Sequence, residues 1–344
     1  MATLHEIARE AGVSVNTVSR VLNGKLKGSY PAVVRKAERV RRIAVKHGYR
    51  PNAAARAMVT RRTQQVGVVV PNTPGKRYTH PVAYEVILGI NEGLQKAGYV
   101  MCLARIDDIR ADLADQSRVF GEHRIDGMIV LSSMPTDVEQ QIESLIPRVV
   151  WCDSNVWRGT GCIRRDERRA GQLAGQAAVA AGYSQFLMMT YSTPNRDHYS
   201  TQERFEGVSD AVAAAGQKLQ VVAEPGIGQT QDRRKIADRL DPRTVIICNS
   251  IYQAHALRSI AEECGRIPGR DFGLACCDDM HQLNRMWPGL ARVSFDRYGM
   301  GLHAATMMID LLEHGAEQCP STLIDCHLIE GGTLKRKAVV DSAS

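Results

Sequence analysis

From Gln65 onward, the chain alternates short apolar runs with longer segments that repeat apolar residues at helical spacing. The apolar runs predict strands at 66–70, 99–104, 127–131, 148–152, 185–189, 219–223, 245–248 and 272–277. Helices are expected between them, for example at 84–97, 168–181, 205–215 and 253–264. Strand–helix alternation of this kind predicts parallel sheets covered by helices on both faces, and the length of the region implies two such lobes.

Charge separates the N-terminal segment from this body. The first 62 residues contain 14 Lys and Arg but only 3 Asp and Glu, a net charge of +11, whereas the remaining residues carry −4. A basic segment joined to a mildly acidic body is expected when only that segment meets a polyanion such as DNA. On charge alone, a solvated surface without a partner remains the alternative.

The N-terminal segment has the pattern of two short helices joined by a tight turn. Thr3 and Glu6 form a capping-box pattern at the start of the first helix, and Gly12 is placed to end it in a left-handed conformation. Ser14 is placed to cap a second helix at 15–22. This arrangement predicts a helix-turn-helix, whose second helix lies in the major groove of DNA.

The outward face of that second helix carries side chains suited to reading bases. Asn16 can pair with adenine through two hydrogen bonds, Arg20 can do the same with guanine, and Val15 can touch a thymine methyl group. An ordinary amphipathic helical hairpin would show the same apolar spacing. The pattern alone therefore leaves both interpretations open.

A third helix is expected from Pro31 to about His47, because proline suits the first turn of a helix. Its polar face is crowded with cations, among them Arg35 and Lys36, and phosphate neutralisation explains so many of them better than solvation does. Farther along, Asn52 can cap an alanine-rich helix that is too short to be stable by itself. That segment is either an interdomain linker or a helix that folds when DNA supplies its partner.

Two stretches of this segment match a known family. The first reads Leu4-x-x-Ile-Ala-x-x-Ala-Gly-Val-Ser-x-x-Thr-Val-Ser-Arg-Val-Leu-Asn, and the second reads Gly-Tyr-x-Pro-Asn-x-x-Ala-Arg-x-Met. Together they closely resemble the head of the lactose-repressor (LacI/GalR-type) family of bacterial transcription regulators. The resemblance implies that the three outward side chains named above occupy base-reading positions. It also implies backbone contacts for three further residues, Ser14, Thr17 and Asn23.

The same resemblance implies that residues 52–59 form a hinge helix, which enters the minor groove as a symmetric pair. Asn52, Ala55 and Met58 would then contact the DNA. Met58 stands where the family usually has a leucine that wedges between base pairs, and an apolar, flexible methionine still suits that role. The loop at 24–31 is longer than is usual in the family. Phosphate contacts are therefore expected to shift to Lys25, Lys27, Arg35 and Lys36.

In folds of the body's type, ligands lie beyond the carboxyl ends of the strands. Three polar residues, Asp153, Asn249 and Asp278, follow predicted strands, and Arg204 is expected at the start of a helix. Carboxylate, amide and guanidinium groups can bind hydroxyls bidentately, which is the usual chemistry of sugar recognition. Each residue type alone is also typical of a helix cap or a surface charge, but their common placement favours one shared site.

The family resemblance extends to the body, more thinly than to the head. The Arg204-x-x-Gly motif and the Asp-Asp pair that begins at Asp278 look like effector-contacting positions of the family, whose body is similar to periplasmic sugar-binding proteins. Three arginines near predicted strand ends also leave room for an acidic effector, with surface arginines as the alternative interpretation. They are Arg105, Arg164 and Arg165.

Several classes of protein are excluded by what the sequence lacks. No phosphate-binding loop, zinc-protease or nucleophile-elbow motif is present, and no Cys/His spacing is typical of a metal site. We therefore expect no catalytic residue, no metal and no cofactor. No apolar run approaches the length of a membrane span, and the N-terminus is charged where an export signal is apolar. Nine cysteines without a C-x-x-C pair suit a reducing cytoplasm.

The predicted fold class is an all-α helix-turn-helix head joined to an α/β body of two doubly wound parallel-sheet lobes, similar to periplasmic binding proteins. The head is expected at 1–50, the hinge helix and linker at 51–64, and the body at 65–335. Within the body, lobe 1 is expected at about 65–164 plus 294–325, and lobe 2 at about 165–293.

The predicted function is sequence-specific regulation of transcription, with repression as the family default. A small molecule, a sugar or a sugar derivative, would bind between the lobes and control the affinity for a pseudo-palindromic operator. We expect a homodimer, because no C-terminal heptad segment offers a tetramerisation device. We also expect a cytoplasmic, nucleoid-associated protein without a membrane partner. The alternative is a periplasmic-type small-molecule-binding protein without a regulatory role.

Overall fold

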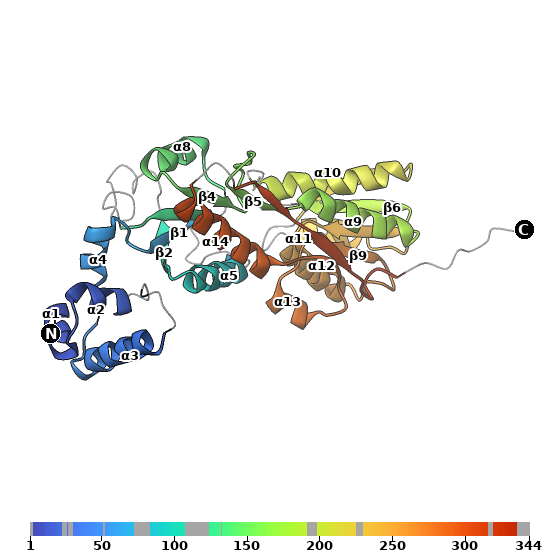
Figure 1. Ribbon diagram of the computed structural model, residues 1–344. Helices are drawn as coiled ribbons and strands as arrows, with labels where there is room; N and C mark the ends of the chain where they lie inside the picture. The colour runs from blue at the N-terminus through green and yellow to red at the C-terminus, as the bar shows by residue number, and fades with distance from the viewer. Residues whose placement is uncertain are drawn as a thin grey trace, which may run out of the picture. The chain divides into compact units, whose positions relative to one another are not determined.

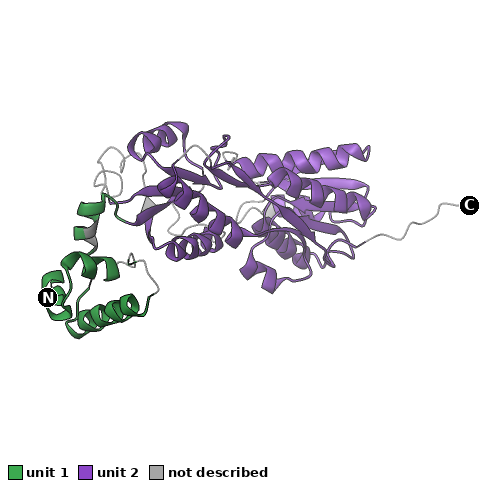
Figure 2. Ribbon diagram, viewed as in Figure 1, with its two compact units in different colours: residues 1–63 green, residues 64–344 purple. Residues whose placement is uncertain are grey.

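The computed structural model describes residues 3–22, 26, 30–50, 52–71, 83–106, 124–131, 133–190, 198–224, 230–315 and 319–335. The chain divides into two compact units, residues 1–63 and residues 64–344 (Figure 2). The first unit is helical and the second contains two sheets, so the predicted fold class is confirmed. In the described part of the chain, no helix combines the length and the apolar character needed to cross a membrane.

The first unit begins with three helices, α1 (Leu4–Ala11), α2 (Val15–Leu22) and α3 (Pro31–Lys46). Both hydrogen bonds of the predicted capping box are present at Thr3, and Gly12 ends α1 with a φ of 63°. Apolar side chains from all three helices, including Ile7, Val18 and Val40, are fully buried in a common core. The pattern of apolar residues thus specifies which face of each helix is turned inward.

A fourth helix, α4 (Ala53–Thr60), follows in the segment expected to be the hinge. Asn52 caps it, since its Oδ1 atom accepts a hydrogen bond of 3.2 Å from the backbone N–H of Ala55. The apolar side chains of Met58 and Val59 are each 84% exposed. This helix therefore leaves large apolar groups in solvent within the single chain.

The first sheet of the body has the strand order β11-β5-β4-β3-β1-β2, and its ladders are parallel. Its strands are β1 (Gln65–Pro71), β2 (Val100–Ile106), β3 (Gly127–Leu131), β4 (Val149–Cys152), β5 (Cys162–Arg165) and β11 (Thr322–Ile324). Helices α5 (Ala83–Lys96) and α14 (Arg297–Glu313) pack on one face, and α8 (Thr136–Leu145) packs on the other (Figure 1). We call this sheet and its helices the first lobe.

The second sheet has the order β12-β10-β9-β8-β6-β7, in which β12 alone runs antiparallel to its neighbour. Its strands are β6 (Gln185–Thr190), β7 (Leu219–Ala223), β8 (Thr244–Cys248), β9 (Gly273–Cys276), β10 (Ala291–Phe295) and β12 (Cys326–Ile329). Helices α9 (Glu167–Ala180) and α10 (Tyr199–Ala214) pack on one face. The other face is covered by α11 (Thr230–Ala237), α12 (Ile251–Glu263) and α13 (His281–Met286). This is the second lobe.

Four of these strands, β5, β10, β11 and β12, do not appear among the strands expected from the sequence. They are short, and charged or polar residues such as Arg164, Arg292 and His327 interrupt their apolar character. Because β10 lies in the second sheet, Ser294 and Phe295 belong to that sheet rather than to the first. In the described residues the chain passes between the sheets at 165–167, at 295–297 and at 324–326.

Candidate DNA-reading face and interlobe polar site

In the first unit, helix α2 presents the polar face that the sequence predicts. Ser14 caps the helix, with its Oγ atom accepting a hydrogen bond of 3.1 Å from the backbone N–H of Thr17. Val18 on the opposite face is fully buried, while Asn16 and Arg20 are exposed and Val15 is half-buried. The buried face therefore fixes the helix, and Asn16 and Arg20 point into solvent, while Val15 packs partly against the core of the head.

Helix α3 is attached to α1 through Glu10. The Glu10 carboxylate accepts a hydrogen bond of 2.8 Å from Lys46 Nζ and another from His47, and these bonds hold its pKa below the usual range. Arg39 also donates to the Glu10 carbonyl, over 3.2 Å. Lys36, a predicted phosphate contact, is exposed on α3.

The remaining predicted DNA contacts are distributed as follows. Asn52, Ala55 and Met58 are exposed at the cap and on the surface of α4. Asn23, and the loop lysines Lys25 and Lys27, lie outside the described residues.

In the second unit, three of the predicted ligand residues lie where strands end. Asp153 follows β4 directly, Asn249 follows β8 directly, and Asp278 lies two residues after β9. The position expected for Arg204 was wrong, because α10 begins at Tyr199 and places Arg204 in its second turn. The helix starts earlier than its apolar spacing suggests because His198 caps it, accepting a hydrogen bond from the Ser200 N–H.

Arg204 is buried and fully engaged by neighbouring groups. Its Nε and Nη2 atoms donate to the two carboxylate oxygens of Glu167 over 2.6 and 2.8 Å, and Nη1 donates to the Asn249 carbonyl over 2.6 Å. The same Nη1 atom is 3.3 Å from Asp278 Oδ2. Burial alone would lower the pKa of Arg204, but Asp278 and then Glu167 raise it well above the usual value. The side chain is therefore a permanent buried cation.

Close packing of α9 against α10 brings Arg204 to Glu167. A Cβ atom built on Gly207 would lie 2.1 Å from the carbonyl oxygen of Arg168, and one on Gly171 would lie 2.2 Å from that of Arg204. Only glycine permits this approach of the two backbones. The glycine of the Arg-x-x-Gly motif, Gly207, is therefore required by the close packing of α9 against α10.

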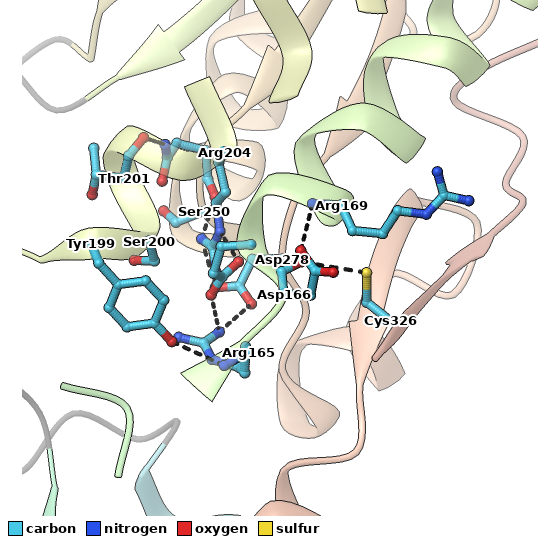
Figure 3. A network of polar contacts seen from close by, with 12 residues as sticks. Arg165, Asp166, Arg169, Tyr199, Ser200, Thr201, Arg204, Ser250, Asp278 and Cys326 are labelled. Atoms are coloured by element: carbon cyan, nitrogen blue, oxygen red, sulfur yellow. Dashed lines mark hydrogen bonds and ion pairs between the residues drawn. The ribbon is translucent and has the colours of Figure 1, made fainter. Parts of the chain in front are cut away.

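Asp278 is surrounded by three guanidinium groups. Besides Arg204, it lies 3.5 Å from Arg165 Nη1 and accepts a hydrogen bond from Arg297 (Figure 3 shows Arg165, Arg204 and Asp278). Burial would raise the pKa of the Asp278 carboxyl, but these arginines, led by Arg204, lower it to about 2. Arg297 also donates to the neighbouring Asp279 over 2.5 Å.

Asp153 adopts an uncommon backbone conformation and is held by both lobes. Its φ is 55°, in the left-handed region that side chains other than glycine seldom occupy. Arg165 of the first lobe donates to its carboxylate over 3.1 Å, and the Tyr199 hydroxyl of the second lobe donates over 2.7 Å. Against the effect of burial, Arg165 foremost and then His198 lower the pKa of Asp153.

These contacts place all four predicted ligand residues in one buried polar network. Sequence reasoning missed Glu167, Tyr199 and Arg297, and Arg165 was noted only as one of three arginines at strand ends. Arg297 lies just after strand β10, which was not expected from the sequence. No sequence signal therefore indicated that Arg297 lies beside the site. Arg164 donates to the Ser154 carbonyl over 2.7 Å and stacks over the Tyr199 ring. The side chain of Arg105 lies outside the described residues.

The network offers carboxylates and guanidinium groups at the carboxyl ends of strands from both sheets. Such groups recognise hydroxyls through paired hydrogen bonds. In the residues that the structure describes, no group of three or more His, Cys, Asp or Glu side chains is placed to hold a metal ion. The thiols of Cys276 and Cys277 are fully buried beside the site, and burial raises the pKa of each, to about 12 for Cys277. They are therefore protonated and unreactive near neutral pH.

Two family models match the chain. Residues 3–52 match bacterial regulatory proteins of the lacI family, and residues 176–334 match a periplasmic binding protein-like domain. The ribose operon repressor of Bacillus subtilis (strain 168) is 27% identical, over 91% of this chain and 92% of its own length.

Solved structures share the whole fold. The complex of the transcriptional regulator CelR with cellobiose aligns with a TM-score of 0.66 and 22% identity, covering 96% of this chain and 98% of that one. The lac repressor dimer bound to operator and the anti-inducer ONPF aligns with a TM-score of 0.77 and 16% identity, covering 97% and 99%.

Fold and head together define a class, namely a helix-turn-helix head on a periplasmic-binding-protein-like body. The chain carries a DNA-binding head of the lacI family of bacterial regulatory proteins and a periplasmic binding protein-like domain, and it is a DNA-binding transcription regulator. The alternative of a binding protein without a regulatory role is not supported, because the regulator model matches the head. The Bacillus relative, which aligns over nearly its whole length, is a repressor.

Proposed function

We propose that this protein is a dimeric repressor whose affinity for a pseudo-palindromic operator is controlled by a sugar or sugar derivative bound between its lobes. The observation that carries the DNA half of the proposal is the exposed pair Asn16 and Arg20 on a helix whose other face is buried. Side chains of this kind, on the second helix of a helix-turn-helix, read base edges in the major groove.

Each half-site would be contacted by one head. Val15, Asn16 and Arg20 would read bases. A second set of residues would contact the phosphate backbone and so contribute to affinity without reading the base sequence. This set comprises Ser14, Thr17, Asn23 and Lys36. The proposed limits of the parts are 1–50 for the head, 51–64 for the hinge and 65–335 for the body.

The hinge helix would enter the minor groove together with its symmetric partner. Met58 and Val59 support this step, since an isolated short helix with both apolar side chains exposed gains little by remaining folded alone. Asn52 and Ala55 would lie along the groove, and Met58 would insert between base pairs as an apolar wedge. The hinge would thus fold fully only on a matching operator.

The proposed effector residues are Asp153, Arg204, Asn249 and Asp278. The structure of the relative CelR was determined with cellobiose, which favours a sugar as the class of ligand. An acidic effector is disfavoured, because Arg165 faces Asp153 and Asp278, and Arg164 donates to a backbone carbonyl. A neutral, hydroxyl-rich ligand can instead exchange hydrogen bonds with this network without adding charge.

A homodimer is proposed on the basis of the exposed apolar side chains on the first lobe. Tyr84 and Leu88 on α5, and Val100 and Leu103 on the edge strand β2, are all exposed. Exposed apolar side chains at a sheet edge are typical of a surface covered by a partner. We further propose that the protein acts in the cytoplasm, binds its effector without transforming it, and requires no cofactor.

Effector binding would act by favouring one arrangement of the lobes. A tenfold change in operator affinity needs only about 1.4 kcal/mol of difference between the two arrangements, which is within the usual range of about 1–3 kcal/mol for allosteric coupling.

The direct test incubates the full-length protein with fragmented genomic DNA and sequences the fragments that it retains, with and without added cellobiose and ribose. We expect one inverted-repeat motif to be enriched, and its retention to change with a sugar that fits the site. Retention of fragments without any common motif would overturn the sequence-specific reading. A common motif whose retention no sugar alters would leave the DNA reading intact and overturn the choice of these two sugars.

A further inference from the structure

The two lobes of the body meet at a buried polar contact, and DNA binding by the head does not explain why this contact is there. Arg165 is the last residue of β5 in the first sheet, and the chain then enters the second lobe at Glu167, the first residue of α9. The Arg165 side chain is only 6% exposed. A buried guanidinium at a crossing point between lobes costs free energy unless nearby carboxylates compensate it.

The carboxylates that compensate Arg165 come from both lobes. In the first lobe, its Nε and Nη2 atoms donate to Asp153 over 3.3 and 3.1 Å. Toward the second lobe, its Nη1 atom is 2.9 Å from Glu167 Oε1 and 3.5 Å from Asp278 Oδ1. The Nη1 atom makes no hydrogen bond of good geometry, so its attraction to these two carboxylates is electrostatic.

Tyr199 adds a second link at the same place. Its hydroxyl accepts a hydrogen bond of 3.1 Å from the backbone N–H of Arg165 and donates one of 2.7 Å to Asp153. Tyr199 begins α10 of the second lobe, whereas both of its partners lie at strand ends of the first. Figure 3 shows Tyr199, Arg165 and Asp278 side by side at this junction.

The carboxylates at this junction outnumber the guanidinium groups by one. Four carboxylates, those of Asp153, Glu167, Asp278 and Asp279, face three guanidinium groups, those of Arg165, Arg204 and Arg297. Without Arg165, the cations that pair across the lobes here would be Arg297, with Asp278 and Asp279, and Arg164, which lies 3.7 Å from Glu203. Like charges in a poorly solvated place repel strongly.

We propose that Arg165 is a positioning residue that ties the two lobes together and so sets their separation for the ligand site. Its guanidinium draws Asp278 of the second lobe toward Asp153 of the first, which are both proposed ligand residues. This inference rests on the proposed function for its regulatory meaning. Its test needs neither ligand nor DNA, so its failure is distinguishable from a failure of the proposed function.

The test is hydrogen–deuterium exchange of the full-length protein with Arg165→Met, which keeps the length of the side chain and removes the charge. If Arg165 ties the lobes together, the amides of this variant should exchange about tenfold faster on both sides of the junction, in 153–165 and in 278–297, because local opening becomes easier there. The sheet cores at 66–70 and 245–248 should not change. The matched control is Arg168→Met, since Arg168 forms exposed ion pairs within the second lobe only and should leave the junction unaffected.

The outcomes separate a tie from a merely local role. Faster exchange confined to 153–165 would mean that Arg165 only supports its own lobe, and it would overturn the proposal, as would no change at all. Adding Asp278→Asn to Arg165→Met should slow the exchange of 153–165 again, because the unpaired carboxylate is removed; an additive further increase would contradict the tie. If Arg165→Met does not fold, Arg165→Lys decides by the same comparison, with a smaller increase expected on both sides.

Discussion

The Nη1 atom of Arg165 lies 3.5 Å from Oδ1 of Asp278, although Arg165 ends a strand of the first sheet and Asp278 follows a strand of the second. Asp278 also lies within ion-pair distance of Arg204, which α10 supplies, and of Arg297, which begins α14. One carboxylate thus connects the second lobe to the first. The proposed tie between the lobes depends on that connection in the body, whereas the account of this protein as a regulator depends on an exposed reading helix in the head.

Replacing Tyr199 by Phe tests the hydroxyl bridge. The substitution keeps the ring, over which Arg164 stacks at 4.3 Å, and removes only the oxygen atom. It leaves the buried N–H of Arg165 without its acceptor, which should lower the free energy of unfolding by about 1–3 kcal/mol. Urea unfolding measures this change. Tyr298→Phe is the matched control, because that hydroxyl bonds to Glu92 at an exposed position and its loss should cost under about 0.5 kcal/mol. Equal losses in the two variants would contradict the bridge.

Replacing Gly207 by Ala tests the close approach of α9 and α10. The new methyl group would lie 2.1 Å from a backbone oxygen that no rotamer change can move, so the helices must separate. We expect a loss of stability of about 1–3 kcal/mol from overpacking, together with weaker ligand binding as Arg204 shifts. Gly159→Ala serves as the control, because nothing lies within 4 Å of its added methyl group. Unchanged thermal unfolding of the Gly207 variant would show that the interface yields easily.

The pH dependence of stability follows from Asp278. Its pKa falls from 3.8 to about 2 in the folded chain, so its carboxylate stabilises the fold fully above pH 3.8 and loses that effect as the pH falls toward 2. Asp153 acts in the same direction, because its pKa is also lowered. Thermal unfolding between pH 5 and pH 2 should therefore show a steep drop below about pH 4. Asp278→Asn should flatten that drop, and an equally steep drop in this variant would assign it to other groups.

Much of the fold was predictable because its cores obey simple periodicities. The limits of α1 and α2 follow from caps and a glycine, and the buried strands β3 and β8 follow from continuous apolar runs. The strand β5, with the sequence Cys-Ile-Arg-Arg, carries no such signal, because Arg165 is buried in ion pairs whose partners include Asp278, which is distant in the sequence. Periodicity cannot reveal a charge whose partners are set by tertiary structure.

The candidate site was predictable in part for the same reason. Asp153, Asn249 and Asp278 stand out because each is polar directly after an apolar run. Glu167 and Tyr199 lie in helices, where one acidic or aromatic residue is unremarkable by itself, and they join the network only through the packing of α9 and α10. A residue whose partners lie far away in the sequence can be recognised as part of the site only from the structure.

Hydrogen exchange of the hinge tests whether it folds fully on DNA. The backbone amides of α4 (Ala53–Thr60) should exchange rapidly in the free full-length protein and in complexes with random duplex. They should be protected only on the operator, where the second hinge helix completes the packing around Met58. Met58→Ala should weaken operator affinity without lowering the unfolding temperature, because this side chain is 84% exposed. Equal protection on random DNA would contradict a hinge that senses the operator.

Base reading by α2 is the claim on which the regulatory account depends most, and paired affinity measurements of two variants test it directly. Arg20→Ala should cost about 1–3 kcal/mol of binding free energy on the operator and little on random duplex. Lys36→Ala should instead weaken binding to both DNAs alike and reduce the salt dependence, as loss of a phosphate contact does. An Arg20 variant that loses the same affinity on operator and on random DNA would contradict the account.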